Sequence, residues 1–282
     1  MDTETLIAPT EARAPMTEIT GHTRLYGILA DPVAQVKTPQ VMAEVFARHG
    51  VDGVLVPMQV APDGLRQVVD GLRRMKNFGG FIATMPHKPA MLGLCDVIEG
   101  DGARIGAVNC VRREDDGRMV GAMLDGIGFV TGLRQAGIDP SGRRILLAGA
   151  GGAASAIAFA LAEAGAEALT ILNRTAEKAE DLAARVAAAY PSCATRGTGT
   201  AGDVGSYNLI ANATSAGLRA GDPLPLPVEA LHAGQVVAEA IMEPAETRLL
   251  AEARARGATV HPGLPMLRCQ IELMARHMGA IA

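Results

Sequence analysis

The sequence predicts an α/β protein with two domains, and three observations carry that prediction. The chain has 282 residues, more than one ordinary small domain needs. Apolar segments with the length of strands alternate with amphipathic segments with the length of helices, which is typical of parallel sheets. A glycine-rich turn in the second half follows a buried strand and opens a helix. The 33 glycines, together with only 3% aromatic residues and no Trp, favour close packing of helices on sheets.

The first half of the chain predicts three strands and three helical segments, followed by a hairpin. Thr38 is the expected N-cap of the first helix, and Pro39 its first helical residue. Asp115, Asp116 and Gly117 form the expected hairpin turn. The expected strands are residues 24–30, 53–60 and 81–85, the helical segments 38–49, 62–75 and 90–95, and the hairpin strands 105–113 and 118–123.

The second half repeats the alternation. The expected strands are residues 144–148, 168–172, 208–213 and 236–241, and the expected helices are 153–164, 176–189, 246–256 and 267–278. We place the domain boundary near residues 126–132, where hinge motion across a cleft is expected. The first domain then covers residues 21–125 and the second 126–264, while the helix in 265–282 is expected to pack back on the first domain. Residues 1–20 are expected to be a flexible extension and no signal peptide, because they lack a basic start and an apolar core.

Composition excludes several classes of function. The net charge of −4 gives no general basic field for nucleic acid. No apolar run reaches the ~18 residues that span a membrane. The four cysteines (Cys95, Cys110, Cys193 and Cys269) are widely spaced and include no C-x-x-C pair. Free thiols predict a reducing, cytoplasmic location. Either a monomer or a homodimer is compatible with the sequence.

The glycine-rich turn matches a dinucleotide-binding fingerprint. Residues 149–154 read GAGGAA, a G-x-G-x-x-A pattern between the buried strand 145–148 and a helix. Gly149 permits the tight turn, Gly151 lets the backbone approach a pyrophosphate, and Ala154 allows close packing of helix and strand. Gly152 and Ala153 lie at the helix N-terminus, which offers free N–H groups to phosphates.

The residues after the next strand predict NADP as the cofactor. An acid at this place would bind the ribose hydroxyls of NAD and repel a 2′-phosphate. The chain instead has Asn173, Arg174 and Thr175, followed by Lys178. Arg174 can make a charge-assisted contact with a 2′-phosphate, while Asn173 and Thr175 offer neutral hydrogen bonds. The alternative is that Arg174 is an ordinary surface charge.

Lys88 is the candidate catalytic residue of the first domain. The chain has only four lysines, and Lys88 follows a predicted strand, where ligands bind in parallel sheets. An ammonium can donate to a carbonyl oxygen and transfer a proton. Asp125, at the domain junction, is its candidate partner. His87 is a less favoured donor, because neighbouring side chains in an extended segment point to opposite faces. A surface lysine and a turn aspartate remain the alternative reading.

Other chemistries lack their motifs. No His, Cys, Asp or Glu cluster has the spacing of metal ligands, so no metal is expected. Neither Ser155 nor Ser215 lies in a G-x-S-x-G elbow, so acyl transfer is unsupported.

Taken together in order, these motifs resemble the shikimate/quinate dehydrogenase family over residues 25–279, nearly the whole chain. The segments that carry the resemblance are ADPV at 30–33, TMPHK at 84–88, IGAVN at 105–109, LDG at 124–126, GAGGA at 149–153, NRT at 173–175, NATSAG at 212–217 and PGLPMLRCQ at 262–270. Several motifs in one order are more specific than any one of them alone.

The resemblance implies an NADP-dependent oxidoreductase that interconverts 3-dehydroshikimate and shikimate, or a closely related cyclic hydroxy compound, in aromatic amino-acid synthesis. It implies an N-terminal α/β substrate domain and a Rossmann-type NADP-binding domain with a cleft between them. Lys88 and Asp125 would be the catalytic pair. The substrate-binding residues would be Thr38, Thr84, Asn109 and Gln270. Residues 212–217, with Thr214, would line the nicotinamide side.

The chain departs from the family pattern at four positions on the expected substrate side. The family has Ser-x-Ser-Pro, Asn-Val-Thr, Asn-Thr-Asp-Gly and Tyr-x-Pro where this chain has Val36, Ile82, Leu124 and Met242 at one polar position of each. Two or three lost polar contacts would weaken shikimate binding by about 10²–10⁴-fold. The chain is then either a weak shikimate enzyme or one that acts on a less polar alcohol or ketone.

Two other functions remain open from the sequence. One is quinate dehydrogenation with NAD, against which Arg174 argues. The other is a ligand sensor on a dehydrogenase scaffold that performs no turnover, because a shared fold does not establish a substrate. Two features argue against the sensor: the Lys88–Asp125 pair and the glycine turn.

Overall fold

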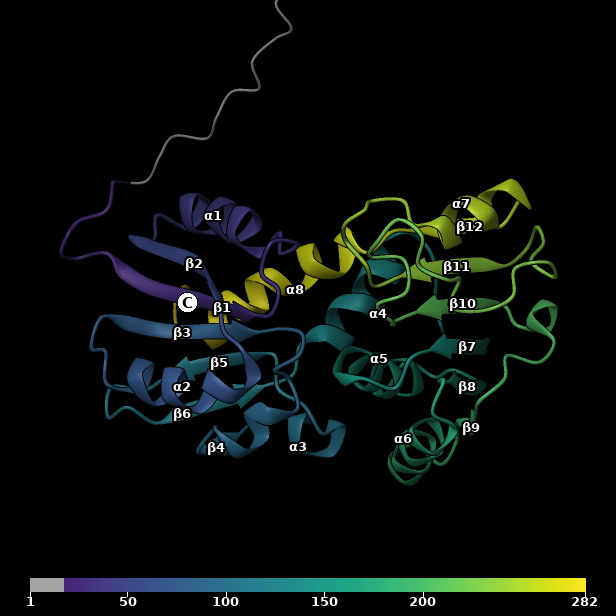
Figure 1. Cartoon of the computed structure of the whole chain (residues 1–282), viewed down its shortest axis with the longest axis horizontal. Coiled ribbons are helices and arrows are strands. Elements are labelled where there is room, and N and C mark those ends of the chain that lie inside the picture. The colour runs from purple at the N-terminus through teal and green to yellow at the C-terminus, as the bar shows by residue number, and fades with distance from the viewer. Residues whose placement is uncertain (1–17) are drawn as a thin grey trace, which may run out of the picture.

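The computed structural model describes residues 18–282, which form two sheets with helices packed around them (Figure 1). Of the extension expected over residues 1–20, residues 1–17 lie outside the described part, and residues 18–20 form no helix or strand. Within the described residues, no helix is both long and apolar enough to cross a membrane.

The first sheet has six strands in the order β2-β1-β3-β5-β6-β4. Their bounds are β1 (Arg24–Ala30), β2 (Gly53–Gln59), β3 (Phe78–Ala83), β4 (Val97–Ile98), β5 (Cys110–Arg113) and β6 (Met119–Ala122). β1 runs parallel to β2 and β3, but the β5–β6 hairpin joins β3 in antiparallel fashion. The sheet is therefore mixed: the predicted hairpin is confirmed as β5 and β6, and it adds antiparallel pairs to the parallel strands.

Helices cover both faces of this sheet. They are α1 (Thr38–His49) and α2 (Leu65–Arg73), with the short 3₁₀ turns η1 (Pro62–Gly64) and η2 (Ala90–Gly93). The short helix α3 (Gly102–Ile105) instead contacts α5 (Gly152–Glu163), and its Ile105 packs in the core of the second domain. Ile28 and Leu29 alternate between the faces: Ile28 packs with α1 and the C-terminal helix, and Leu29 packs with α2. Both faces are thus buried, as the apolar run in β1 requires.

The second sheet is wholly parallel, in the order β12-β11-β10-β7-β8-β9. Its strands are β7 (Arg144–Ala148), β8 (Ala168–Leu172), β9 (Ala194–Thr198), β10 (Leu209–Asn212), β11 (Val236–Glu239) and β12 (Thr259–His261). Numbered in chain order, this is the 3-2-1-4-5-6 arrangement of a Rossmann fold, in which the strand order reverses between β7 and β10. The predicted α/β fold with a Rossmann-type domain is confirmed.

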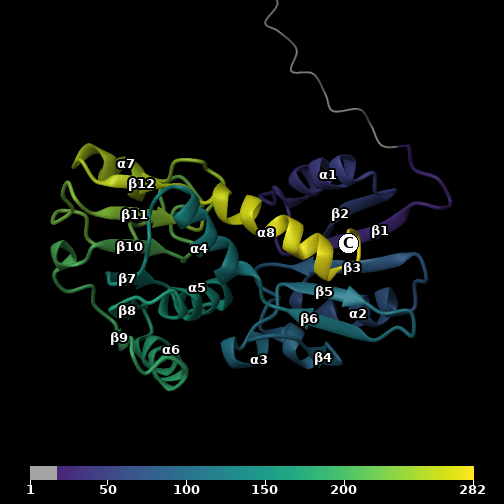
Figure 2. The ribbon, with the colours of Figure 1, turned by 180° about the vertical axis from the view of Figure 1, so that it is seen from behind.

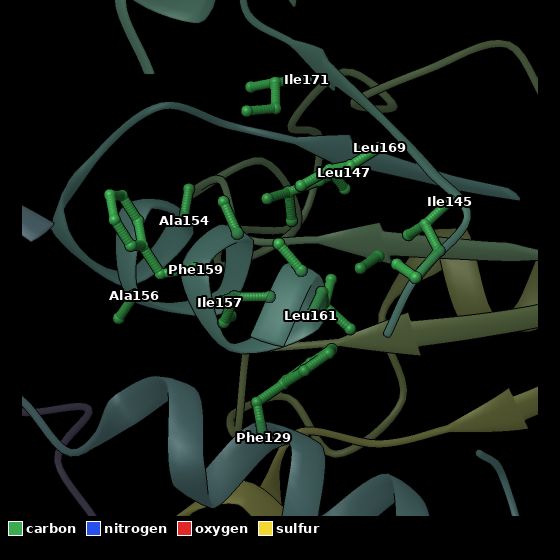
Figure 3. Packing of buried hydrophobic residues seen from close by; sticks show 14 of the residues in the cluster. Phe129, Ile145, Leu147, Ala154, Ala156, Ile157, Phe159, Leu161, Leu169 and Ile171 are labelled. Atoms are coloured by element: carbon green, nitrogen blue, oxygen red, sulfur yellow. The ribbon is translucent and has the colours of Figure 1, made fainter. Parts of the chain in front are cut away.

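The core of the second domain lies between this sheet and its helices α4 (Asp125–Gln135), α5 (Gly152–Glu163) and α6 (Ala176–Ala189). Figure 3 shows Ile157 and Leu161 of α5 among the side chains of β7 and β8, with Phe129 of α4 below them. Many of these contacts are made by alanines, which lets α5 lie close to the strands. The opposite face is covered by η3 (Val204–Ser206), a Pro-rich loop and α7 (Arg248–Ala255).

Two helices connect the domains. α4 begins directly after the first sheet, and α8 (Leu264–His277) runs from the second sheet back across the first, as Figure 2 shows from behind. α4 packs against both α5 and α8. Residues 126–132, where we place the domain boundary and expect hinge motion, are therefore helical and buried for most of their length, so packed helices join the two domains.

Several element boundaries differ from the prediction. The first helix has Lys37 and not Thr38 at its N-cap, and Thr38 is already helical. The third strand starts at Phe78 and includes Gly79 and Gly80, which we had left outside it. Glycine is needed at position 79 because a side chain there would clash with the ring of Tyr26. Residues 102–105 form α3, which ends at Gly106 with φ of 80°, so the hairpin begins only at Cys110.

Three strands were not predicted at all. They are β4, β9 and β12, and each lies at the edge of its sheet. β4 and β12 have only two and three residues, and β9 reads ATRGT, without an apolar alternation. Edge strands carry few buried side chains, so their sequences hold little of the pattern on which the prediction depends.

Replacing Gly126 by Ala is expected to destabilise the protein by about 1–3 kcal/mol, the usual effect of overpacking. A Cβ at Gly126 would lie 2.2 Å from the carbonyl oxygen of Ala156, where α4 meets α5. Urea denaturation measures the change. Gly71→Ala is the matched control, because nothing lies within 4 Å of that Cβ and Gly71 is exposed in α2; it should be neutral or stabilising. Equal effects of both substitutions would contradict the packing assigned to α4.

Candidate active site

A cavity of about 550 Å³ lies between the two domains. Its walls come from the segments that follow β1 and β3 in the first domain, from those that follow β7, β10 and β11 in the second, and from α4 and α8. The second-domain wall includes the point where the strand order reverses, which is where ligands bind in open α/β sheets. A single ligand set in this cavity would contact both domains.

The glycine turn forms the second-domain side of the cavity. Gly149 has φ of 115°, and a Cβ there would lie 2.9 Å from the carbonyl oxygen of Ala213. Gly151 is the N-cap of α5, and nothing lies within 4 Å of its Cβ position. The open face of Gly151 and the N-terminus of α5 together leave room and N–H donors for a pyrophosphate. Gly152 and Ala153 also line the cavity, so the predicted cofactor residues of this turn lie together.

The segment after β8 carries the predicted 2′-phosphate residues. Asn173 lines the cavity, and its Nδ2 donates to the carbonyl oxygen of Thr175 at 2.9 Å. Thr175 is the N-cap of α6. Arg174 and Lys178 are exposed, and within the described residues neither forms an ion pair. Two unpaired cations at this place suit a phosphate group.

The turn after β10 is held by a buried polar network. Thr214 lines the cavity, and its Oγ1 donates to Asn212 Oδ1 at 2.7 Å. Asn212 Nδ2 donates to Glu239 Oε2 at 3.1 Å, and Thr247 Oγ1 donates to the same oxygen at 3.0 Å. Burial raises the pKa of Glu239 to about 7, although its hydrogen bonds act in the opposite direction. The carboxyl group therefore ties the ends of β10 and β11 together beneath the cavity.

Lys88 and Asp125 form a nearly buried ion pair on the first-domain side. Lys88 lies in the turn after β3, and Asp125 is the first residue of α4. Lys88 Nζ donates to Asp125 Oδ2 at 2.5 Å, and their side chains are 13% and 5% exposed. A Cβ on Gly152 would lie 3.2 Å from Lys88 Cβ, so the lysine adjoins the dinucleotide-binding turn.

Two amides hold the other oxygen of Asp125. Asn109 Nδ2 donates to Asp125 Oδ1 at 2.8 Å, and Gln270 Nε2 donates to it at 3.3 Å. Asn109 Oδ1 accepts from the backbone N–H of Leu124. Gln270 lines the cavity, but Asn109 is 1% exposed and lies behind Asp125, outside the lining. The structure thus gives Asn109 a position from which it orients Asp125, in place of the direct substrate contact expected from the sequence.

His87 does not face the cavity. The segment 85–89 is a turn and not the extended strand that we had expected for it. His87 is nevertheless buried away from the lining, and its Nε2 has no hydrogen-bond partner among the described residues. Burial lowers the pKa of His87, which favours the neutral ring. Lys88 is therefore the group of this pair that the cavity can use.

The remaining wall is more apolar than polar. Thr38 and Thr84 line the cavity, as expected, and so do Val36, Ile82 and Met242. Leu124, which we expected to face the substrate, does not: it packs against the cluster beneath α1 and α8. Its backbone N–H donates to Asn109 Oδ1, which holds the residue in this orientation.

Sequence reasoning missed three charged residues near the site. Lys37 Nζ lies 2.9 Å from Glu243 Oε2, and both side chains line the cavity from opposite domains. Their neighbours Val36 and Met242 had been singled out, yet a charge pair between segments so far apart in the chain leaves no local pattern. Glu239 was missed because a buried acid at a strand end resembles an exposed one in sequence. Among residues 18–282, no cluster of three or more acids, His or Cys could hold a metal ion.

A Rossmann sheet whose glycine turn faces an ammonium–carboxylate pair across a cleft defines the class of dinucleotide-dependent oxidoreductases. Two sequence families match the corresponding parts of the chain. Residues 28–111 match the shikimate dehydrogenase substrate binding domain, and residues 133–216 match shikimate / quinate 5-dehydrogenase.

Individual proteins are similar to the chain over most of its length. The chain is 42% identical to a shikimate dehydrogenase (NADP(+)) of Rubrobacter xylanophilus over 260 residues, 89% of each chain. Among solved structures, the Thermus thermophilus shikimate 5-dehydrogenase in complex with NADP(H) and shikimate is 32% identical with a TM-score of 0.82, over 92% of this chain and 94% of that one. A ligand-free 5-ketofructose reductase of Gluconobacter sp. is 35% identical with a TM-score of 0.78, over 90% and 92%. The chain belongs to the shikimate dehydrogenase family.

Replacing Glu239 by Gln is expected to reduce the pH dependence of stability. The folded protein holds the Glu239 proton up to about pH 7, whereas the ordinary value is 4.5. The contribution of this group to stability is therefore complete below pH 4.5 and is lost as the pH rises to about 7. Urea midpoints at about pH 5 and about pH 8 measure the difference. The exposed Glu163→Gln variant serves as control. If the urea midpoint of Glu239→Gln fell between the two pH values by as much as that of the wild type, the assignment would be contradicted.

Proposed function

We propose that this protein is an NADP-dependent dehydrogenase that interconverts a ketone and a secondary alcohol on 3-dehydroshikimate and shikimate, or on a closely related hydroxylated compound. The observation that carries the proposal is the Lys88–Asp125 pair beside the glycine turn, at 3.2 Å between Lys88 Cβ and the Cβ position of Gly152. The relatives support it, because shikimate dehydrogenases that use NADP(+) match almost 90% of the chain.

Lys88 is proposed to act on the substrate oxygen. NADP supplies the hydride to the carbonyl carbon when it is bound as NADPH, and accepts it from the alcohol when bound as NADP⁺. During reduction the C=O bond becomes a C–O bond, and the Lys88 ammonium donates the hydrogen bond and the proton that the oxygen needs. During oxidation the neutral Lys88 amine takes the proton of the hydroxyl and becomes the ammonium.

Asp125 is proposed to fix Lys88. One carboxylate oxygen accepts from Lys88 Nζ, and the other accepts from Asn109 and Gln270, so the carboxylate cannot rotate without breaking several bonds. Thr38, Thr84 and Gln270 line the same cavity as Lys88 and Asp125 and can bind the substrate hydroxyls. These residues present neutral donors and acceptors, which suits an alcohol or a ring carrying several hydroxyls.

NADP is proposed to be held by the glycine turn and the segment after β8. The N-terminus of α5 faces the pyrophosphate position, and Thr214 shapes the wall on the nicotinamide side. Arg174 and Lys178 supply the positive charge for the 2′-phosphate, with Asn173 and Thr175 beside them. The absence of an acid at these positions disfavours NAD and therefore quinate dehydrogenation with NAD.

A non-catalytic sensor is the second class of function. A sensor requires no ordered proton donor. The Lys88–Asp125 pair is nevertheless buried, and Asn109 and Gln270 fix its carboxylate, which favours an enzyme. Four free cysteines, two of them buried, favour a cytoplasmic location for either kind of protein. The two named activities among the relatives differ in charge, because shikimate carries a carboxylate and 5-ketofructose carries none, and both are substrate candidates for this chain.

Lys88→Ala is expected to lower kcat by about 10²–10⁴-fold, the usual contribution of a positioned proton donor. Steady-state oxidation of shikimate and quinate and reduction of 5-ketofructose measure the change, each with NADP(H) and with NAD(H). Fluorescence titration should show NADP binding retained. Lys76→Ala, an exposed lysine away from the cavity, should behave as wild type. A Lys88→Ala variant with wild-type kcat would contradict the proposed mechanism, and NADP binding by wild type without turnover of any of these compounds would favour the sensor.

Arg174→Ala is expected to weaken NADP binding by about tenfold or more, the value of one charge-assisted hydrogen bond at ~1.4 kcal/mol per tenfold. NAD binding should change little, because NAD lacks the 2′-phosphate. The ratio of the two dissociation constants, from fluorescence titration, reports the effect, with the exposed Arg134→Ala as control. Equal weakening of NAD and NADP would contradict the role given to Arg174.

A further inference from the structure

The charges that line the cavity cancel one another. Among the described lining residues only four carry charge: Lys37 and Lys88 are positive, and Asp125 and Glu243 are negative. Each lysine lies within 2.9 Å of one of the acids. Lys88 is engaged by Asp125 at the inner end, and Lys37 is engaged by Glu243 at the outer end. An anionic substrate would find no free cation there.

Part of the cavity surface is apolar. We call it the uncharged wall; it consists of Ile28, Val36, Ile82, Met242 and Met274. Ile28, Ile82 and Met274 are at most 3% exposed, and all five belong to or pack against the core cluster beneath α1 and α8. The wall is therefore continuous with the core and holds no polar group that could replace the water around a carboxylate.

The ion pair at the outer end adds a second obstacle. Lys37 lies in the first domain, at the N-cap of α1, and Glu243 follows β11 in the second. Their side chains are 42% and 52% exposed, so the pair stands at the mouth of the cavity. A carboxylate that approached Lys37 would also approach Glu243, whose like charge opposes it.

From this arrangement we propose that the site takes an uncharged substrate: a neutral hydroxy ketone or its alcohol, with hydroxyls toward Thr38, Thr84 and Gln270 and its less polar edge on the uncharged wall. The inference rests on the proposed hydride-transfer function and narrows its substrate class. The Lys37–Glu243 pair is then a specificity-determining pair that disfavours carboxylates. The reaction is otherwise unchanged: the alcohol is oxidised to the ketone while NADP⁺ is reduced, and the hydroxyl proton leaves through Lys88.

Shikimate and methyl shikimate make a matched pair of probes, because esterification removes the negative charge and leaves the ring and its hydroxyls. With wild-type protein and NADP⁺, kcat/KM for methyl shikimate is expected to exceed that for shikimate by at least about tenfold, a difference of ~1.4 kcal/mol. Calorimetric titration of the NADP-bound protein should give the same order of affinities. A preference for shikimate, in either measurement, would overturn the inference while leaving the proposed function intact.

Glu243→Gln tests the specificity-determining pair directly. The substitution removes the acid and leaves Lys37 free to meet a carboxylate. We expect kcat/KM for shikimate to rise by about tenfold, with methyl shikimate changed by less than about twofold. Glu246→Gln is the matched control, since Glu246 is exposed on the same segment but lies outside the cavity lining. An unchanged ratio of the two probes in Glu243→Gln would overturn the role of the pair. Absence of turnover with both probes and with 5-ketofructose would instead overturn the proposed function.

Discussion

The buried carboxylate of Asp125 is the constraint around which the two domains are arranged. A buried charge is costly unless every lone pair finds a donor, and the donors here come from distant parts of the chain. Lys88 follows β3, Asn109 precedes β5 and Gln270 lies on α8. Asp125 itself starts α4, which packs against α5 and α8. The geometry of the proposed catalytic pair therefore depends on the correct docking of the helices that join both domains.

The glycine turn of the second domain lies next to this cluster. Reversal of strand order between β7 and β10 opens a crevice, and Gly149 and Gly151 let the backbone approach a ligand there. Small residues at the start of α5 bring Gly152 against Lys88. The same lack of side chains that makes room for a dinucleotide also brings the proposed proton donor next to it. The proposed cofactor site and the proposed catalytic pair thus lie next to each other where Gly152 adjoins Lys88.

How much of this was predictable depends on whether a feature is local in sequence. The glycine turn, Arg174 and Lys88 were each singled out from a few neighbouring residues, and the structure places each of them shortly after a strand. Glu239 and the Lys37–Glu243 pair join segments that are far apart, so no window of sequence contains them. The helical start of α4 at Asp125 was missed because a glycine-rich segment resembles a linker, whereas its glycines permit close helix packing. Short edge strands such as β12 carry too few buried residues to give a pattern.

The central claim is that Lys88 and Asp125 act as one unit, and a double-variant cycle tests it most directly. The values of kcat/KM would be measured for Lys88→Ala, for Asp125→Asn and for the protein with both substitutions, on whichever substrate the wild type turns over. If Asp125 acts by fixing Lys88, the double variant should be about as slow as the slower single variant, because residues of one unit are strongly non-additive. If the two losses multiply instead, the residues contribute independently, and Asp125 does not act through Lys88.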